Sequence, residues 1–324
     1  GLNQEQADAA IIEAAQNGEL VYFWQPLDLG DLVLLFTPDA LKLDGLRVPM
    51  SARVAQLVAD ELGAMLPTAK LADRMFRASN LRLGPFPRPV SSSLEVARQH
   101  DADLEQARAG RQGVVSGWKH WILSPRIAEL KAVNYGWFIE THETHFQGIK
   151  LHPSATDPDL KVIQPESAVH SLDHRDYSQL TQLVSRRAWL NGREVDLADM
   201  LADPKRAEMI ARGVTPARYK VELPPELAPA PDTVPPSCPR VTSPGERGSD
   251  VVTWQRRLIR DGYGSFLEGH GGADGIHGNA TERATVSWFA DRGLDRSRSL
   301  CEPEAGPLVA AEIRSANYTR ANRS

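Results

Sequence analysis

Histidine is concentrated in one part of this 324-residue chain, and imidazole is the side chain whose ordinary pKa permits proton transfer near neutral pH. Seven of the nine histidines fall within 75 or so consecutive positions: His100, His120, His142, His145, His152, His170 and His174. Such clustering is typical of an acid–base centre or of a metal site. We therefore take this stretch as the candidate chemical centre of the protein.

The most explicit pattern is the segment His-Ser-Leu-Asp-His-Arg-Asp-Tyr-Ser that starts at His170. His170 and His174 would share a helical face, whereas His174 and Asp176 would share one face of a strand. These two imidazoles and the carboxylate would suit a catalytic zinc ion. They equally suit metal-free acid–base work, with Asp176 orienting His174 and Tyr177 donating a proton. A purely structural histidine network is the third interpretation.

A group from a neighbouring strand would complete either centre, because adjacent strands lie only about 4.8 Å apart. We expect His120 or His142 to supply this ligand or base. Lys119 is a further candidate, together with Tyr177 and His170, if the enzyme cleaves a polysaccharide.

Two other groups of residues in the same stretch could bind or cleave a polymer. Glu140, Glu143 and Glu166 could form a glycosidase carboxylate pair, which only their separation would decide. The aromatic residues that alternate with polar ones could line a sugar or peptide cleft, or could be half-buried strand residues; they are Trp118, Tyr135 and Trp137.

The elements expected to position these residues are helices first and strands later. Apolar spacing and N-cap residues predict helices at 3–16, 51–62, 68–79 and 93–108. Alternating or short apolar runs predict strands at 20–24, 32–36, 113–123 and 132–140, and Asn191-Gly192 predicts a hairpin within 187–197. The absence of a βαβ alternation in this order predicts an α+β body over residues 1–220.

Residues 221–240 carry seven prolines and form a predicted extended linker, since proline lacks the donor that helices and sheets need. They separate the body from a C-terminal module at 241–324. Two cysteines, Cys238 and Cys301, bracket this module, and we expect them to form a disulfide, which indicates an oxidising compartment.

The module reads Gly-Ser-Asp-Val from Gly248, then Trp-Gln-Arg-Arg-Leu from Trp254, and later Asp-Gly-Ile-His-Gly-Asn-Ala-Thr from Asp274. It resembles the type 1 peptidoglycan-binding domain over about 60 residues. The resemblance implies a small all-α, three-helix module that tethers the body to peptidoglycan or another wall polysaccharide. Tyr263, Asp274 and His277 are the expected contacts to the sugar or peptide.

The body resembles an uncharacterised group of secreted bacterial proteins between about Leu66 and Val184. The shared positions are Leu66-Pro67-Thr68, Lys70 to Asp73, Leu83, Lys119, Tyr135-Gly136-Trp137, Gln164-Pro165, His170 and Asp176-Tyr177-Ser178. Two histidines of that pattern are replaced here by Phe138 and Gln179, so no role of theirs carries over. This resemblance implies no particular activity.

Composition excludes several classes of function. The net charge of −5 lacks the basic excess that nucleic-acid binding needs, and no apolar run is long enough to span a bilayer. There is no Gly-x-Ser-x-Gly elbow or phosphate-binding Gly-x-x-x-x-Gly-Lys, and both cysteines lie outside the histidine-rich body.

The sequence thus predicts a secreted or periplasmic, monomeric cell-wall hydrolase that cleaves peptide or amide bonds, with zinc as the one cofactor considered. A polysaccharide lyase or glycosidase and a non-catalytic wall-binding protein are the alternatives.

Overall fold

The structure is a computed structural model that describes residues 4–22, 24–127, 131–224, 227, 242–247, 249–258, 263, 266–267 and 275–290. The chain divides into two compact units, of which the first comprises residues 1–190 and 195–227. The boundary after residue 227 falls inside the predicted linker at 221–240. Cys238, Cys301 and the predicted disulfide between them lie outside the described residues.

The helices of the body begin where local sequence signals predict. The side chains of Ser51, Thr68 and Ser93 each accept a hydrogen bond from the backbone N–H three residues later, which is the usual N-cap arrangement. The predicted helices are confirmed as α1 (Gln4–Gln16), α2 (Ala52–Glu61), α3 (Ala69–Ala78) and α4 (Leu94–Arg108).

One antiparallel sheet of the body has the order β1-β2-β14-β15, and β5 also pairs with β14. Its strands are β1 (Gln25–Asp28), β2 (Leu32–Phe36), β5 (Ala64–Met65), β14 (Val184–Leu190) and β15 (Arg193–Asp196). The predicted hairpin is confirmed: Asn191 and Gly192 have φ values of +51° and +78°, as a type I′ turn requires. The predicted strand at 20–24 is wrong, because the partner of β2 begins at Gln25, opposite Phe36.

The second sheet carries the candidate chemistry and has the order β12-β13-β9-β8, all antiparallel. Its strands are β8 (Lys119–Trp121), β9 (Lys131–Ile139), β12 (His152–Pro153) and β13 (Lys161–Ser171). β9 confirms the strand predicted at 132–140. The strand predicted at 113–123 is broken at Gly117, where a Cβ would lie 2.7 Å from the carbonyl oxygen of Leu83.

The shorter strands form separate pairs. β6 (Leu81–Arg82) and β7 (Val115–Ser116) are parallel, whereas β3 (Lys42–Leu43) with β4 (Leu46–Arg47) and β10 (His145–Phe146) with β11 (Ile149–Lys150) are antiparallel hairpins.

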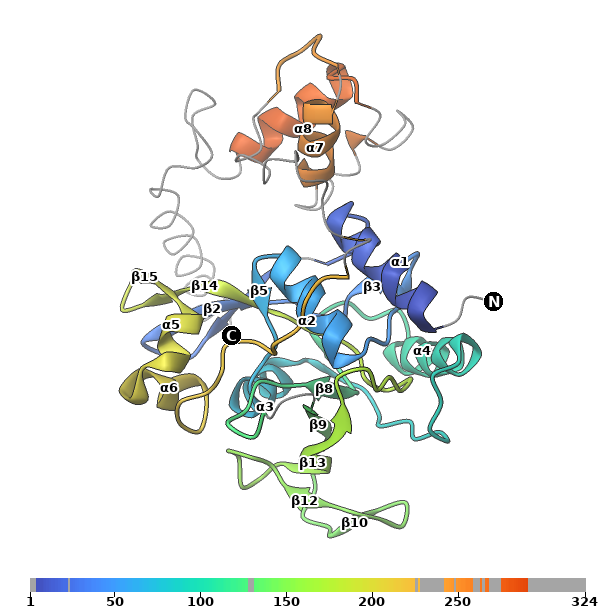
Figure 1. Ribbon diagram of the computed structural model, residues 1–324, viewed down its shortest axis with the longest axis vertical. Coiled ribbons are helices and arrows are strands. Elements are labelled where there is room, and N and C mark those ends of the chain that lie inside the picture. Colours follow the sequence, from blue (N-terminus) through green and yellow to red (C-terminus); the bar gives the residue numbers. More distant parts are fainter. Residues whose placement is uncertain are drawn as a thin grey trace. The chain divides into compact units, whose positions relative to one another are not determined.

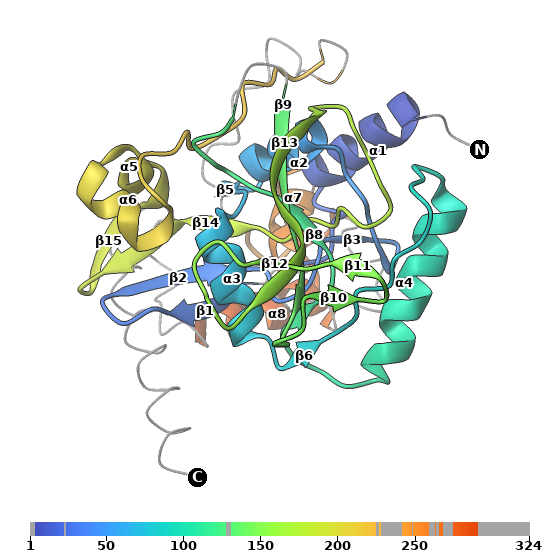
Figure 2. The ribbon, with the colours of Figure 1, turned by 90° about the horizontal axis from the view of Figure 1, so that it is seen from below.

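The helices surround the two sheets of the body. In Figures 1 and 2, α4 lies on one side of the body and α5 (Leu197–Ala202) with α6 (Pro204–Ile210) on the opposite side. α3 packs on the second sheet, where Ala72 and Phe76 join Val133, Tyr135 and Phe138 in one buried cluster. The body is therefore an α+β fold, as predicted, and no helix among its described residues is long and apolar enough to cross a bilayer.

The C-terminal unit contains α7 (Ser249–Leu258) and α8 (Asn279–Ala290) within its described residues. Trp254 and Leu258 of α7 pack with Ala284 and Trp288 of α8, and the Trp254 indole donates a 2.8 Å hydrogen bond to Thr285 Oγ1. The third predicted helix would fall outside the described residues.

Candidate active site

A buried ion pair joins two elements that are distant in the sequence. Lys119 Nζ in β8 lies 2.9 Å from Asp176 Oδ2 in the loop after β13, and their side chains are only 11% and 3% exposed. Asp176 Oδ2 also accepts a 3.0 Å hydrogen bond from Ser178 Oγ, and Gln179 Oε1 accepts one from the Asp176 backbone N–H. The charged pair is thus held rigidly in the interior of the body.

Two histidines lie near enough to this ion pair for its charges to shift their pKa values. His170 is the next-to-last residue of β13, and His174 follows in a turn, where its backbone N–H donates to the carbonyl oxygen of Ser171. Their half-buried rings stack with centroids 4.0 Å apart and planes at 14°, and both meet the edge of Trp121. The structure thus brings His170 and His174 together across a strand end and a turn, and not on one face of a helix.

Both imidazoles are neutral at neutral pH. Burial first of all, together with the proximity of His174 and Lys119, lowers the pKa of His170 to about 4, against the opposing effect of the Asp176 carboxylate. Burial also lowers the pKa of His174, again against the effect of Asp176. A half-exposed neutral imidazole is a proton acceptor, so this pair can serve as a general base.

A distortion of β9 brings Trp137 to the same side. Gly136 and Trp137 have φ values of +134° and +56°, which breaks the regular alternation of the strand. Trp137 therefore packs with Tyr177, and its ring lies 4.7 Å from Lys119 Nζ. The indole face thus contributes a cation–π contact to the buried ammonium group.

The hydroxyl of Tyr177, the predicted proton donor, is hydrogen-bonded to the backbone of Arg88. Its hydroxyl donates to the carbonyl oxygen of Arg88 and accepts from the Arg88 backbone N–H, and its ring meets His100 edge-on. Burial raises the pKa of Tyr177. The structure therefore gives this hydroxyl a positioning role for the loop.

Two buried amides near this ion pair, those of Asn134 and Gln179, are not predicted by the sequence. Asn134 is opposite Trp121 in the register of β8 and β9, on the face that carries Lys119. Neither its amide nitrogen nor its oxygen has a partner among the described residues, and the same holds for Gln179 Nε2 and Trp137 Nε1. A buried polar group in this state costs about 1–3 kcal/mol unless water or a ligand completes its bonds. No local signal distinguishes such an asparagine from an ordinary strand residue.

The predicted zinc ligands do not form a zinc site in this arrangement. Imidazole lone pairs lie in the ring planes, and the nearly parallel planes of His170 and His174 do not direct them to one point. Asp176 is engaged by Lys119 and Ser178. No group of three potential ligands is found among the described residues. The zinc site therefore stays a prediction, and these ring and ion-pair geometries do not add to it.

The remaining residues predicted for the centre are directed elsewhere. His120 is opposite Tyr135 in the register and lies on the other face of the sheet, near Phe138, where burial lowers its pKa to about 3. His142 is exposed in the turn before β10. Alternation along β8 explains the separation, because adjacent residues of a strand point to opposite faces.

The predicted aromatic cleft is not present as a surface. Trp118 is 0% and Tyr135 1% exposed, because β8 and β9 are covered on both faces. The Tyr135 hydroxyl donates a 2.6 Å hydrogen bond to Asp73, so these two residues belong to the core. Trp137, at 7%, is also buried, and it contacts Lys119 and Tyr177.

The carboxylates considered for a glycosidase do not form an evident pair. Glu140 is held between the guanidinium groups of Arg77 and Arg82. Glu143 is exposed in the same turn as His142, and Glu166 lies in β13 beside Arg126.

In the C-terminal unit, one predicted ligand contact proves to be structural. His277 is 1% exposed, with Nδ1 2.6 Å from Thr242 Oγ1 and Nε2 3.0 Å from Glu282 Oε2. Tyr263 is half-buried and stacks with Phe266 against the core, and Asp274 lies outside the described residues. A separate hollow of about 540 Å³ is lined by Gln255, Leu267, Ile276, Gly278, Asn279, Ala280, Thr281 and Arg283.

Comparisons with known protein families, curated proteins and solved structures find no match to this chain. The resemblance of the C-terminal unit to peptidoglycan-binding domains therefore stays a prediction, and a functional assignment must come from the residues themselves.

Proposed function

We propose that the body is a cell-wall-degrading enzyme that works by metal-free proton transfer, and that the C-terminal unit holds it on peptidoglycan in the extracellular or periplasmic space. The observation that carries the catalytic part is the stacked, neutral His170–His174 pair beside the buried Lys119–Asp176 ion pair. Imidazoles that are neutral at pH 7 and reachable from solvent can accept a proton from water or substrate.

The residues of this centre divide into two roles. His170 and His174 are half-buried and can contact substrate, so they are the proposed catalytic residues. Lys119 and Asp176 are buried and act through the histidines as positioning residues, since their charges shift the pKa of His170 in opposite directions.

Two bond types are compatible with this base. Peptide or amide hydrolysis requires the imidazole to deprotonate a water molecule that attacks the carbonyl carbon. Polysaccharide cleavage by elimination requires the base to remove a proton from a sugar carbon while the bond to the glycosidic oxygen on the next carbon breaks; a C=C bond forms, and the leaving oxygen takes up a proton from water or a second acid. Polysaccharide cleavage by elimination is favoured by one observation. His170 and His174 offer a base, but their nearly parallel rings do not point at a common metal ion that would activate the attacking water.

The experiment is digestion of purified peptidoglycan sacculi by the full chain, with the released fragments analysed by mass spectrometry. New amino termini support peptide or amide hydrolysis, and unsaturated or reducing ends support polysaccharide cleavage. We expect His170→Ala and His174→Ala to lose most of the activity, and His145→Ala, which changes an exposed histidine of the same body, to keep it.

The proposal is overturned if both His170→Ala and His174→Ala retain the wild-type rate. Binding to sacculi without any release of fragments would instead support a non-catalytic wall-binding protein.

A further inference from the structure

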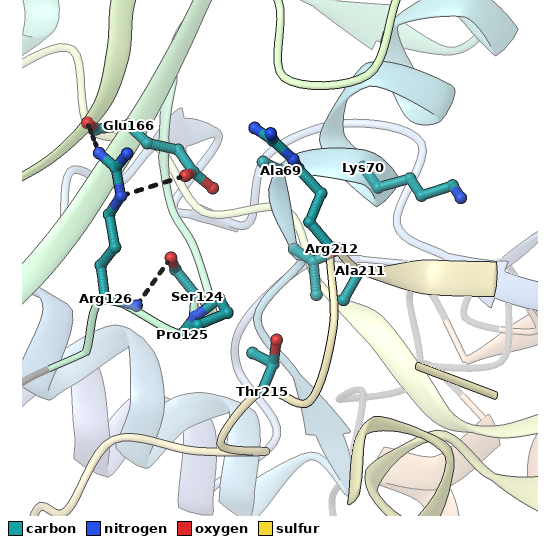
Figure 3. A pocket seen from close by; sticks show the side chains of 10 residues that line it. Ala69, Lys70, Ser124, Pro125, Arg126, Glu166, Ala211, Arg212 and Thr215 are labelled. Atoms are coloured by element: carbon teal, nitrogen blue, oxygen red, sulfur yellow. Dashed lines mark hydrogen bonds and ion pairs between the residues drawn. The ribbon is translucent and has the colours of Figure 1, made fainter. Parts of the chain in front are cut away.

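A second polar hollow lies in the body, and its lining is predominantly basic. Four segments distant in sequence meet there: the start of α3, the residues that follow β8, the middle of β13 and the loop after α6. The hollow has a volume of about 220 Å³ (Figure 3). We call it the basic pocket, and it is lined by Thr68, Ala69, Lys70, Ser124, Pro125, Arg126, Glu166, Ala211, Arg212 and Thr215.

The walls of the basic pocket are fixed by hydrogen bonds between these segments. Thr68 Oγ1 donates to the carbonyl oxygen of Ile210, and the backbone N–H of Leu123 donates to the carbonyl oxygen of Pro67 at 2.9 Å. Lys70 Nζ reaches the carbonyl oxygen of Glu208 at 2.5 Å. The pocket is therefore a preformed feature of the fold.

The charges in the basic pocket are unbalanced. It contains three cationic side chains and one carboxylate, that of Glu166. Arg126 Nε is 3.8 Å from Glu166 Oε2, a loose contact, and its Nη1 donates to the Glu166 backbone oxygen at 3.1 Å. Arg212 makes no ion pair or hydrogen bond within the described part of the chain. Positive charge is thus left available on at least one guanidinium group.

The positions of these groups suit an oxyanion. In Figure 3, Arg126 and Arg212 stand on opposite sides of the hollow, whereas Lys70 extends away from it. The hydroxyl-bearing residues Ser124 and Thr215 also line it. Guanidinium groups bind carboxylate and phosphate through paired N–H donors. The volume is enough for such a group, given that one water occupies about 30 Å³ of liquid.

We propose that the basic pocket binds the oxyanion group, carboxylate or phosphate, of an acidic ligand, with Arg212 and Arg126 as its main contacts. This binding site lies outside the His170 centre, and the proposal does not depend on the function proposed for that centre. Glu166 competes with the ligand for Arg126. Removing the charge of Glu166 should therefore strengthen binding of the ligand, whereas removing the charge of Arg212 should weaken it.

The test is isothermal titration of the full chain with inorganic phosphate and, separately, with succinate, at low ionic strength and pH 7.5. Arg212→Gln should weaken binding about tenfold, which corresponds to about 1.4 kcal/mol. Glu166→Gln should strengthen binding severalfold. Arg206→Gln, an exposed arginine of α6 outside the pocket, is the matched control and should change affinity less than about twofold. Tighter binding of phosphate or of succinate identifies the source of the oxyanion.

The proposal is overturned if neither probe binds to the wild-type chain, if Arg212→Gln behaves like Arg206→Gln, or if Glu166→Gln weakens binding. If net positive charge alone decided affinity, Arg212→Gln and Arg206→Gln would weaken binding equally. If Glu166 had only a structural role, Glu166→Gln would not bind the probe more tightly.

Discussion

Replacing Asp176 by Asn tests whether the Lys119–Asp176 pair is a buried, energetically coupled element of the site. The substitution preserves the shape of the side chain and removes its charge. Lys119 then stays in the interior with a cation–π contact to Trp137 but without its carboxylate.

The magnitude follows from the geometry. Unit charges 2.9 Å apart attract by about 6 kcal/mol at an effective dielectric constant of about 20. Much of this attraction offsets the cost of removing both charges from water, but breaking such a pair leaves one buried charge uncompensated and costs about 3–5 kcal/mol. Since Trp137 still contacts the ammonium group, we expect Asp176→Asn to lower the free energy of unfolding by about 3 kcal/mol.

The assay is urea unfolding of the full chain, followed by far-UV circular dichroism and tryptophan fluorescence together, because a chain with two units need not unfold in one step. Asp173→Asn is the matched control: Asp173 pairs with Arg53 at 2.6 Å, but the two side chains are 62% and 32% exposed. An exposed pair contributes less than about 1 kcal/mol. If Asp176→Asn lowers the free energy of unfolding no more than Asp173→Asn does, the proposed coupling within the buried Lys119–Asp176 pair is refuted.

Three further predictions concern the same sheet and the hairpin. His120→Phe should keep wall-degrading activity and should lose less stability than wild type when the pH is lowered. The pKa of His120 in the fold is about 3, below its ordinary value, so the wild-type protein loses the stabilisation from this neutral histidine as pH falls from about 6.5 towards 3. Urea unfolding at pH 7 and at pH 4 measures the difference. Gly136→Ala should lower the free energy of unfolding by about 1–3 kcal/mol, since φ is +134° and the new Cβ would lie 2.9 Å from the backbone oxygen of Trp118. Gly278→Ala is the control, because its Cβ would meet open space, and equal melting temperatures of the two variants would contradict the prediction. Gly192→Ala should destabilise the hairpin by about 1 kcal/mol, because its φ of +78° disfavours a Cβ, and an unchanged melting temperature would argue against the turn.

Local interactions made much of the fold predictable from the sequence. Ser51, Thr68 and Ser93 cap their helices through contacts that span three residues, so the signal is contained in the segment that uses it. The Asn191-Gly192 turn is equally local, because its positive φ values depend on those two residue types.

β13 could not be predicted in the same way. It is the longest strand in the described part of the chain, yet it contains Pro165 and has no clear apolar alternation. Its pairing with β9 shifts register between Gln164 and Ser167, which lets the proline, a residue without a backbone donor, remain within the strand. Only the partner strand makes this segment extended.

For the candidate site, the sequence identified His170, His174 and Asp176 because they are close together in the chain. It could not decide what they contact. The pairing of Asp176 with Lys119 joins residues 57 positions apart, and it depends on how β8 and the loop after β13 pack. The face on which His120 lies is likewise set by strand register, since a shift of one residue would exchange it with Lys119. The sequence by itself determined which side chains could do chemistry and where the helices begin; the tertiary structure alone decided which of those side chains meet, because sheet pairing and burial are long-range interactions that no short segment encodes.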